Sequence, residues 1–204
     1  FYIEETEQNN GTSFVLQCSK EVLEEAQTYF AVLQGLESER TKHDNILTDF
    51  KGIYSNGVKI TDTPSLYGYN FTNSDLINRD RSTVDMEKLK VETRTLLADI
   101  ESEEVITEVV QGILEDDGLL EAQAGIVHTK HVSIWKKVIK KLFGDKVALA
   151  TGTETDTRAR YKKFTVITGL PKVLGNFFYM YLDVYRSNML QETTTATNVH
   201  KKTT

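Results

Sequence analysis

The alternation of apolar and polar positions is sharpest in residues 133–143. Apolar residues come in pairs at positions 134/135, 138/139 and 142/143, and lysines come in pairs at 136/137 and 140/141. Because an α-helix has about 3.6 residues per turn, this spacing places the apolar pairs on one face and the lysines on the other. The pattern predicts an amphipathic helix around Trp135, the only tryptophan of the chain.

The N-terminal part of the chain shows a turn signal followed by helical spacing. Two runs of aromatic and β-branched residues flank an Asn-Asn-Gly turn at 9–11, which predicts a β-hairpin over residues 1–17. Ser19 is a suitable N-cap for the apolar spacing that follows, which continues to Tyr54 as one long helix or as a helical hairpin. Residues 58–60 then form a candidate short strand, followed by a loop anchored by aromatic residues.

The rest of the chain is predicted to be mainly helical. One apolar stripe begins at Ser82 or Thr83, and a second begins at Ser102 and ends before an Asp-Asp-Gly stop at 116–118. Residues 147–151 and 163–168 have the composition of two strands joined by a polar loop. Pro171 then opens a last helix, apolar almost all round, that extends to about residue 190.

These elements predict a mainly α fold, an α+β class in which helices dominate. It has an N-terminal β-hairpin, a long helix or helical hairpin, a helical bundle, and a small β element before a C-terminal apolar helix. We expect a single helical domain over 1–190, with a candidate sub-boundary near 74–82, and a polar C-terminal tail over 191–204.

Composition narrows the protein class. Apolar residues make up 39% and charged residues 26% of the 204 positions, which favours a folded chain over a disordered one. Cys18 is the only cysteine, so an internal disulfide and a multi-cysteine zinc site are both excluded, and we expect a buried structural thiol. No stretch reaches the roughly 18 apolar residues of a membrane-spanning helix, which favours a soluble protein of a virion or the cytoplasm.

Charge is divided unevenly along the chain. Residues 1–129 carry a net charge of −15 and residues 130–204 a net charge of +9. The stretch 101–121 holds acidic residues but no lysine or arginine. The simplest interpretation pairs it with the Trp135 helix, with charges at the flanks and a shared core of Val109, Ile113, Trp135 and Ile139. The alternative is that the Trp135 helix binds a membrane surface or a partner's groove.

The basic residues of the C-terminal third are candidates for nucleic-acid binding. Aromatic residues are interleaved with the cations of residues 158–164, as in surfaces that stack bases and contact phosphates. The same residues on an exposed strand would instead protect a sheet edge by charge. The basic-patch candidates are Lys136, Lys137, Lys140, Lys141, Arg158, Arg160, Lys162 and Lys163.

No motif predicts an enzyme. The sequence has no phosphate-binding loop, dinucleotide glycine pattern, metalloprotease motif or nucleophile elbow. His128 and His131 are three positions apart, but a metal site needs a third ligand that no spacing supplies. We therefore predict no catalytic, cofactor or metal site.

The leading hypothesis is a non-enzymatic structural or adaptor subunit of a larger protein assembly, for example a phage virion or head–tail component. Its C-terminal helix and tail would contact other subunits, identical or different, and the interface candidates are Trp135, Phe177, Tyr181 and Tyr185. A nucleic-acid-binding module that uses the basic C-terminal third is the alternative. Membrane-surface binding through the Trp135 helix is a further alternative, disfavoured because that helix has barely three turns.

Overall fold

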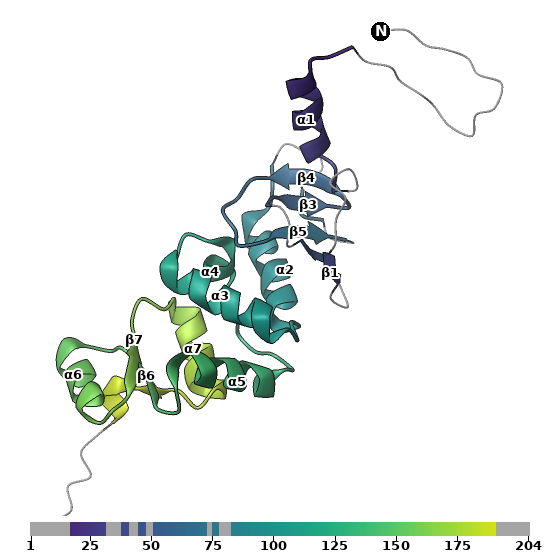
Figure 1. Ribbon diagram of the computed structural model, residues 1–204. Coiled ribbons are helices and arrows are strands. Elements are labelled where there is room, and N and C mark those ends of the chain that lie inside the picture. Colours follow the sequence, from purple (N-terminus) through teal and green to yellow (C-terminus); the bar gives the residue numbers. More distant parts are fainter. Residues whose placement is uncertain are drawn as a thin grey trace, which may run out of the picture. The chain divides into compact units, whose positions relative to one another are not determined.

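The computed structural model describes residues 17–31, 38–40, 45–47, 51–72, 75–77 and 83–190. The chain divides into two compact units, Phe1–Asp85 and Met86–Thr204. The division lies just beyond the sub-boundary expected near 74–82, and each unit has its own set of elements (Figure 1). Residues 1–16 of the predicted hairpin and the tail 191–204 lie outside the described residues.

The described residues of the first unit include helix α1 and a five-stranded sheet. Helix α1 spans Lys20–Thr28, and the Ser19 hydroxyl caps it by accepting a hydrogen bond from the backbone N–H of Val22 at 3.4 Å, as predicted. Strands run in the order β1-β2-β5-β3-β4, with β3 and β5 parallel and the other neighbours antiparallel. Their bounds are β1 Ser38–Arg40, β2 Asn45–Leu47, β3 Ile53–Ser55, β4 Val58–Thr61 and β5 Gly68–Phe71.

The prediction of a long helix or helical hairpin up to Tyr54 is wrong. Helix α1 ends at Thr28. Of the later apolar positions, Ile46 and Leu47 belong to strand β2, and Ile53 and Tyr54 belong to strand β3. Ile53 and Tyr54 are adjacent and both fully buried, as expected for a strand covered on both faces. Periodicity cannot distinguish such a short apolar run from part of a buried helix. The strand expected at 58–60 is confirmed as β4, and the aromatic anchors Tyr69 and Phe71 are buried in β5.

The second unit is mainly helical, so the described chain has the predicted α+β class with helices dominant. Its helices are α2 Met86–Ala98, α3 Glu103–Glu115, α4 Leu120–Ala124, α5 Val132–Phe143, α6 Thr153–Tyr161, α7 Lys172–Tyr181 and the short 3-10 helix η2 Ser187–Met189. Its strands are β6 Val147–Leu149, β7 Thr165–Ile167 and β8 Tyr185–Arg186. Among the described helices, none has the length and apolar character needed to span a membrane.

The predicted pairing of the acidic and basic helices is confirmed. Helices α3 and α5 pack together, and the four predicted core residues Val109, Ile113, Trp135 and Ile139 are all buried. The Ser102 hydroxyl caps α3 by accepting from the Val105 N–H at 3.3 Å, and α3 ends at the predicted Asp-Asp-Gly stop. Lys137 of α5 contacts Glu103 of α3 at 2.5 Å, which places one charge pair at the flank of this core.

The small β element is a parallel sheet. Strands lie in the order β7-β6-β8, and β6 is parallel to both neighbours. Parallel neighbours need a crossover connection, and here α6 joins β6 to β7 while α7 joins β7 to β8. The predicted polar loop between the first two strands is therefore wrong, because α6 occupies it. Only Ala159 of α6 is buried, so this helix has no apolar stripe to reveal it.

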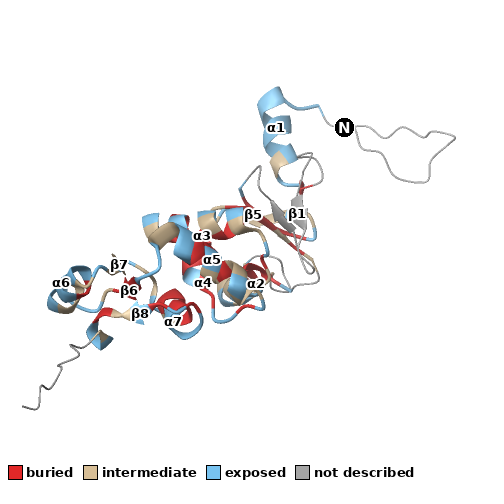
Figure 2. Ribbon diagram, turned by 60° about the horizontal axis from the view of Figure 1, so that its bottom comes forward, coloured by how far each residue is buried: buried red, intermediate tan, exposed pale blue. Residues whose placement is uncertain are grey.

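The C-terminal helix is shorter than predicted. Helix α7 ends at Tyr181, and Asp183 follows with a positive φ of 58°, a conformation that does not continue a helix. The chain then enters β8 and completes the sheet. In Figure 1 and Figure 2, α6 and α7 lie on opposite sides of the strands of this sheet.

Candidate functional site

The carboxyl ends of β6, β7 and β8 meet at one edge of the parallel sheet. Residues 150–152 follow β6, residues 168–171 follow β7, and Ser187 follows β8. In open sheets of this kind, ligands bind outside the carboxyl ends of the strands, where neighbouring connections leave in opposite directions. The order β7-β6-β8 produces such a point between β6 and β8. The chain leaves β6 to form β7 on one side of it and later returns to form β8 on its other side.

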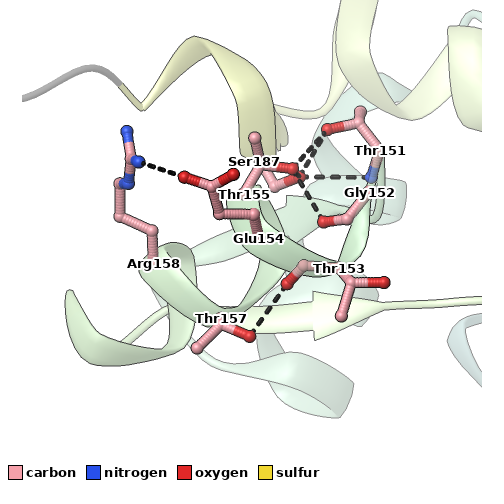
Figure 3. Close-up of polar contacts among 8 residues, drawn as sticks. All are labelled: Thr151, Gly152, Thr153, Glu154, Thr155, Thr157, Arg158 and Ser187. Carbon is pink, nitrogen blue, oxygen red and sulfur yellow. Dashed lines mark hydrogen bonds and ion pairs between the residues drawn. The ribbon is translucent and has the colours of Figure 1, made fainter.

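A network of hydroxyl groups joins the ends of β6 and β8 (Figure 3). Ser187 is buried and donates its single proton to the Asp156 carboxylate at 2.5 Å. Thr151 Oγ1 lies 2.6 Å from Ser187 Oγ, so the Thr151 hydroxyl is the donor in that pair. Thr151 Oγ1 in turn accepts a hydrogen bond from the Asn188 N–H at 3.1 Å. The network fixes two loops that are 36 residues apart in the chain.

Asp156 is the charged centre of this network. Burial alone raises the pKa of its carboxyl group, but hydrogen bonds from the Ser187 hydroxyl and from the backbone N–H groups of Thr151 and Gly152 lower it, as does nearby Arg160. The net effect is a pKa below the ordinary value for aspartate. Asp156 lies in the first turn of α6, so its ionised carboxylate is near the N-terminal end of that helix. The Ser187 hydroxyl donates a hydrogen bond to this carboxylate and so has a structural role.

An open pocket lies beside the network. It has about 300 Å³ of space and is lined by the strand ends and by the first turns of α7. Leu149, Ile167 and Leu170 form its apolar part, and Lys172, Arg186 and Asn188 contribute polar groups. None of the described residues that line it is acidic. We call this the strand-end pocket.

Arg186 is held in place at the pocket by two neighbours. Its guanidinium donates a hydrogen bond to Asn176 Oδ1 at 2.9 Å and lies 4.5 Å from the centre of the Tyr179 ring. Stacking on an aromatic face and a fixed hydrogen bond both restrict the side chain before any ligand arrives. The pocket therefore contains a pre-oriented planar cation.

An apolar surface adjoins the same residues on the exposed side of α7. Tyr179 donates a hydrogen bond to the sulfur of Met189 at 3.3 Å, which links α7 to η2. Met180 is 67% exposed and Met189 is 52% exposed. We call Tyr179, Met180 and Met189 the Tyr–Met surface.

Comparisons with protein-family models, curated proteins and solved structures found no match for this chain.

Two of the four predicted interface residues are not on the surface. Trp135 and Phe177 are buried and pack edge to face with ring centres 5.5 Å apart, so neither side chain is available to a partner or a membrane. Their interface assignment is wrong because both belong to the core between α5 and α7. Tyr181 and Tyr185 are exposed, as an interface requires.

The sequence interpretation missed the Tyr–Met surface. Tyr179 and Met180 lie in the C-terminal helix, which was predicted to be apolar almost all round. That apolar character was the signal in the sequence for an exposed apolar surface. Buried α7 positions Leu174, Phe177 and Phe178 leave those two residues on the exposed side. Met189 joins them only because the chain folds back after Asp183.

The basic-patch candidates are distributed over α5, α6 and the residues after α6, and four of the eight contact acids of the chain itself. On α5, Lys136 contacts Asp183 at 2.6 Å, and Lys140 contacts Asp145 at 2.6 Å, in addition to the Lys137 pair with Glu103. On α6, Arg158 contacts Glu154 at 2.9 Å. Arg158 and Arg160 belong to α6, so the alternative that they protect an exposed strand edge is wrong, while Lys162 and Lys163 follow α6 and Lys141 is exposed on α5.

The other singled-out residues form no described site. His131 starts α5, with its Nε2 atom 3.5 Å from Glu101 and 3.8 Å from Asp99, whereas His128 is exposed. In the described part of the chain, no group of three or more potential ligands could hold a metal ion. Cys18 is exposed, so the prediction of a buried thiol is wrong. It precedes α1, which has no buried residue against which the thiol could pack.

Proposed function

We propose that this protein is a non-enzymatic structural or adaptor subunit that associates with other protein subunits through its Tyr–Met surface. The observation that carries the proposal is the exposed contact between Tyr179 of α7 and Met189 of η2, with Met180 also exposed at the next position of α7. Tyrosine, methionine and arginine are enriched in protein interfaces, and Arg186 stacks on Tyr179 at the edge of this surface. Methionine side chains are flexible and adapt to an opposing surface.

A second copy of the chain is the partner that charge favours. The Tyr–Met surface lies in the C-terminal third, whose net charge is +9. Helix α3 and the turn after it expose acids that include Glu104, Glu115 and Asp116. A contact between the basic part of one copy and the acidic part of the next is heterologous, so it extends into a ring or a filament.

Sedimentation velocity of the full chain over a range of concentrations tests this proposal. We expect self-association that weakens about tenfold in Met180→Asp, because an unpaired carboxylate would enter the interface. Val127→Asp is the matched control, since Val127 is also exposed but follows α4, away from α7 in sequence. A chain that stays monomeric at every concentration, or equal weakening by both variants, would contradict the proposal.

A further inference from the structure

The strand-end pocket has the charge of an anion site. Lys172 and Arg186 line it, and neither forms an ion pair with any acidic residue that the structure describes. This differs from the cations of α5 and α6, several of which contact acids of the chain. Two cations that line one cavity without a carboxylate favour a negatively charged ligand there.

The groups at the pocket suit a phosphate more than a carboxylate. The planar guanidinium of Arg186 matches phosphate geometry, and Asn176 and Tyr179 already restrict it. Lys172 adds a second positive charge at the first residue of α7, a ten-residue helix whose N-cap Pro171 makes no side-chain capping bond. A dianion is attracted by both cations, whereas a carboxylate offers a single charge.

The size and walls of the pocket indicate an organic body on this phosphate. The space of about 300 Å³ is at the lower end for small-molecule pockets, yet it exceeds the needs of a lone oxyanion. Leu149, Ile167 and Leu170 provide apolar contacts. The hydroxyl network between Thr151 and Ser187 holds the adjoining loops, so the pocket is preformed.

We propose that the strand-end pocket binds a small organic phosphate monoester. Its phosphate contacts Arg186 and Lys172, and its apolar body lies against Leu149, Ile167 and Leu170. The ligand is a free small molecule, since the cavity is small and lies at the end of a sheet. This site adjoins the Tyr–Met surface through Arg186, which stacks on Tyr179, but Lys172 lies outside that surface. Loss of phosphate binding in Lys172→Gln with unchanged self-association therefore separates this site from the proposed interface.

Phenyl phosphate is a suitable probe, because it combines a phosphate monoester with a compact apolar ring. It is titrated into the full ¹⁵N-labelled chain, and binding is followed by the amide shifts of Gly169 and Asn188 and by the side-chain N–H of Arg186. Inorganic phosphate, glycerol phosphate and phenylacetate are titrated in parallel. We expect saturable shifts confined to the pocket, with phenyl phosphate binding more tightly than all three comparison compounds.

Variants then assign the contacts. Lys172→Gln and Arg186→Gln should each weaken phenyl phosphate binding about tenfold or more, because each removes a charge-assisted hydrogen bond. Arg158→Gln is the matched control, since Arg158 is exposed on α6 and pairs with Glu154. Lys172 is exposed, so its variant keeps the test valid if Arg186→Gln alters the fold.

Several results would overturn the proposal. One is the absence of saturable phenyl phosphate binding, and another is equal loss of affinity in Arg158→Gln. Phenylacetate binding as tightly as phenyl phosphate would refute the preference for a phosphate. Equal affinity for inorganic phosphate would refute the apolar contact and leave an adventitious ion only.

Discussion

Replacing Trp135 tests the packing of the second unit most directly. Its side chain is fully buried between α5 and α7 and meets the ring of Phe177 edge to face. Removal of a buried aromatic ring to leave alanine costs about 3–5 kcal/mol, which combines lost burial with the cavity that remains. An aromatic pair of this kind contributes about 0.5–1.5 kcal/mol of that cost beyond its buried area.

Trp135→Phe should lower the free energy of unfolding less than Trp135→Ala does. The indole Nε1–H of Trp135 is buried and has no hydrogen-bond partner among the described residues. An unsatisfied buried donor costs about 1–3 kcal/mol, and phenylalanine removes that donor while keeping an aromatic ring beside Phe177. We therefore expect Trp135→Ala to lower the free energy of unfolding by at least about 2 kcal/mol more than Trp135→Phe.

Urea denaturation followed by far-UV circular dichroism measures both variants, with Val127→Ala as an exposed control expected to change stability by less than about 0.5 kcal/mol. Fluorescence adds an independent check, since the chain has one tryptophan. Its emission should be blue-shifted and protected from iodide. A cost below about 1 kcal/mol for Trp135→Ala, together with the emission of a solvated indole, would refute the core assignment and restore Trp135 as a surface contact.

Three further predictions concern other contacts of the second unit. Because the folded chain lowers the pKa of Asp156, its ionised form stabilises the fold above the unfolded value of about 3.9. That stability is lost as the pH falls through the lower pKa of the folded state. Asp156→Asn should therefore reduce the decrease in unfolding free energy at acidic pH, measured by circular dichroism, and an unchanged decrease would contradict this. Gly125 has a φ of +63°, and a Cβ there would lie 2.8 Å from Val173. Thermal unfolding should therefore show Gly125→Ala to be more destabilising than Gly144→Ala. At Gly144 a Cβ meets open space, so alanine adds only the roughly 1–3 kcal/mol cost of a backbone conformation that is essentially restricted to glycine; equal effects would count against the clash. Ser102→Ala removes the cap of α3 and should cost about 1 kcal/mol in urea denaturation, whereas no loss would show that the cap is dispensable.

Sequence reasoning succeeded where one helix face carried a continuous signal. Trp135 and Ile139 repeat at helical spacing, and Ser102 precedes such a repeat, so both the helices and their shared core could be predicted. Helix α6 offered no such signal, because Ala159 is its only buried residue. Without α6 the two strands beside it could be read as antiparallel, although their parallel arrangement is what creates the strand-end pocket.

The candidate site was therefore beyond the reach of local patterns. Thr151 and Ser187 are 36 residues apart and meet only because β6 and β8 are parallel neighbours. Arg186 was a single cation among aromatic residues, and its role depends on Asn176 and Tyr179 from another element. Contacts of this kind follow from topology, which short-range periodicity does not specify.

These contacts determine how much of the uneven charge of the chain is available to an outside ligand. Three lysines of α5 contact Glu103, Asp145 and Asp183, so the lysine pairs of the Trp135 helix are partly neutralised within the second unit. Each such exposed pair contributes little stability, but each reduces the field available to an outside anion. Lys172 and Arg186 are isolated in sequence and lack such acids within the described chain. Recognition of an anion is therefore expected where cations are few but unpaired and pre-oriented, and the denser lysine pairs of the Trp135 helix are the weaker candidates.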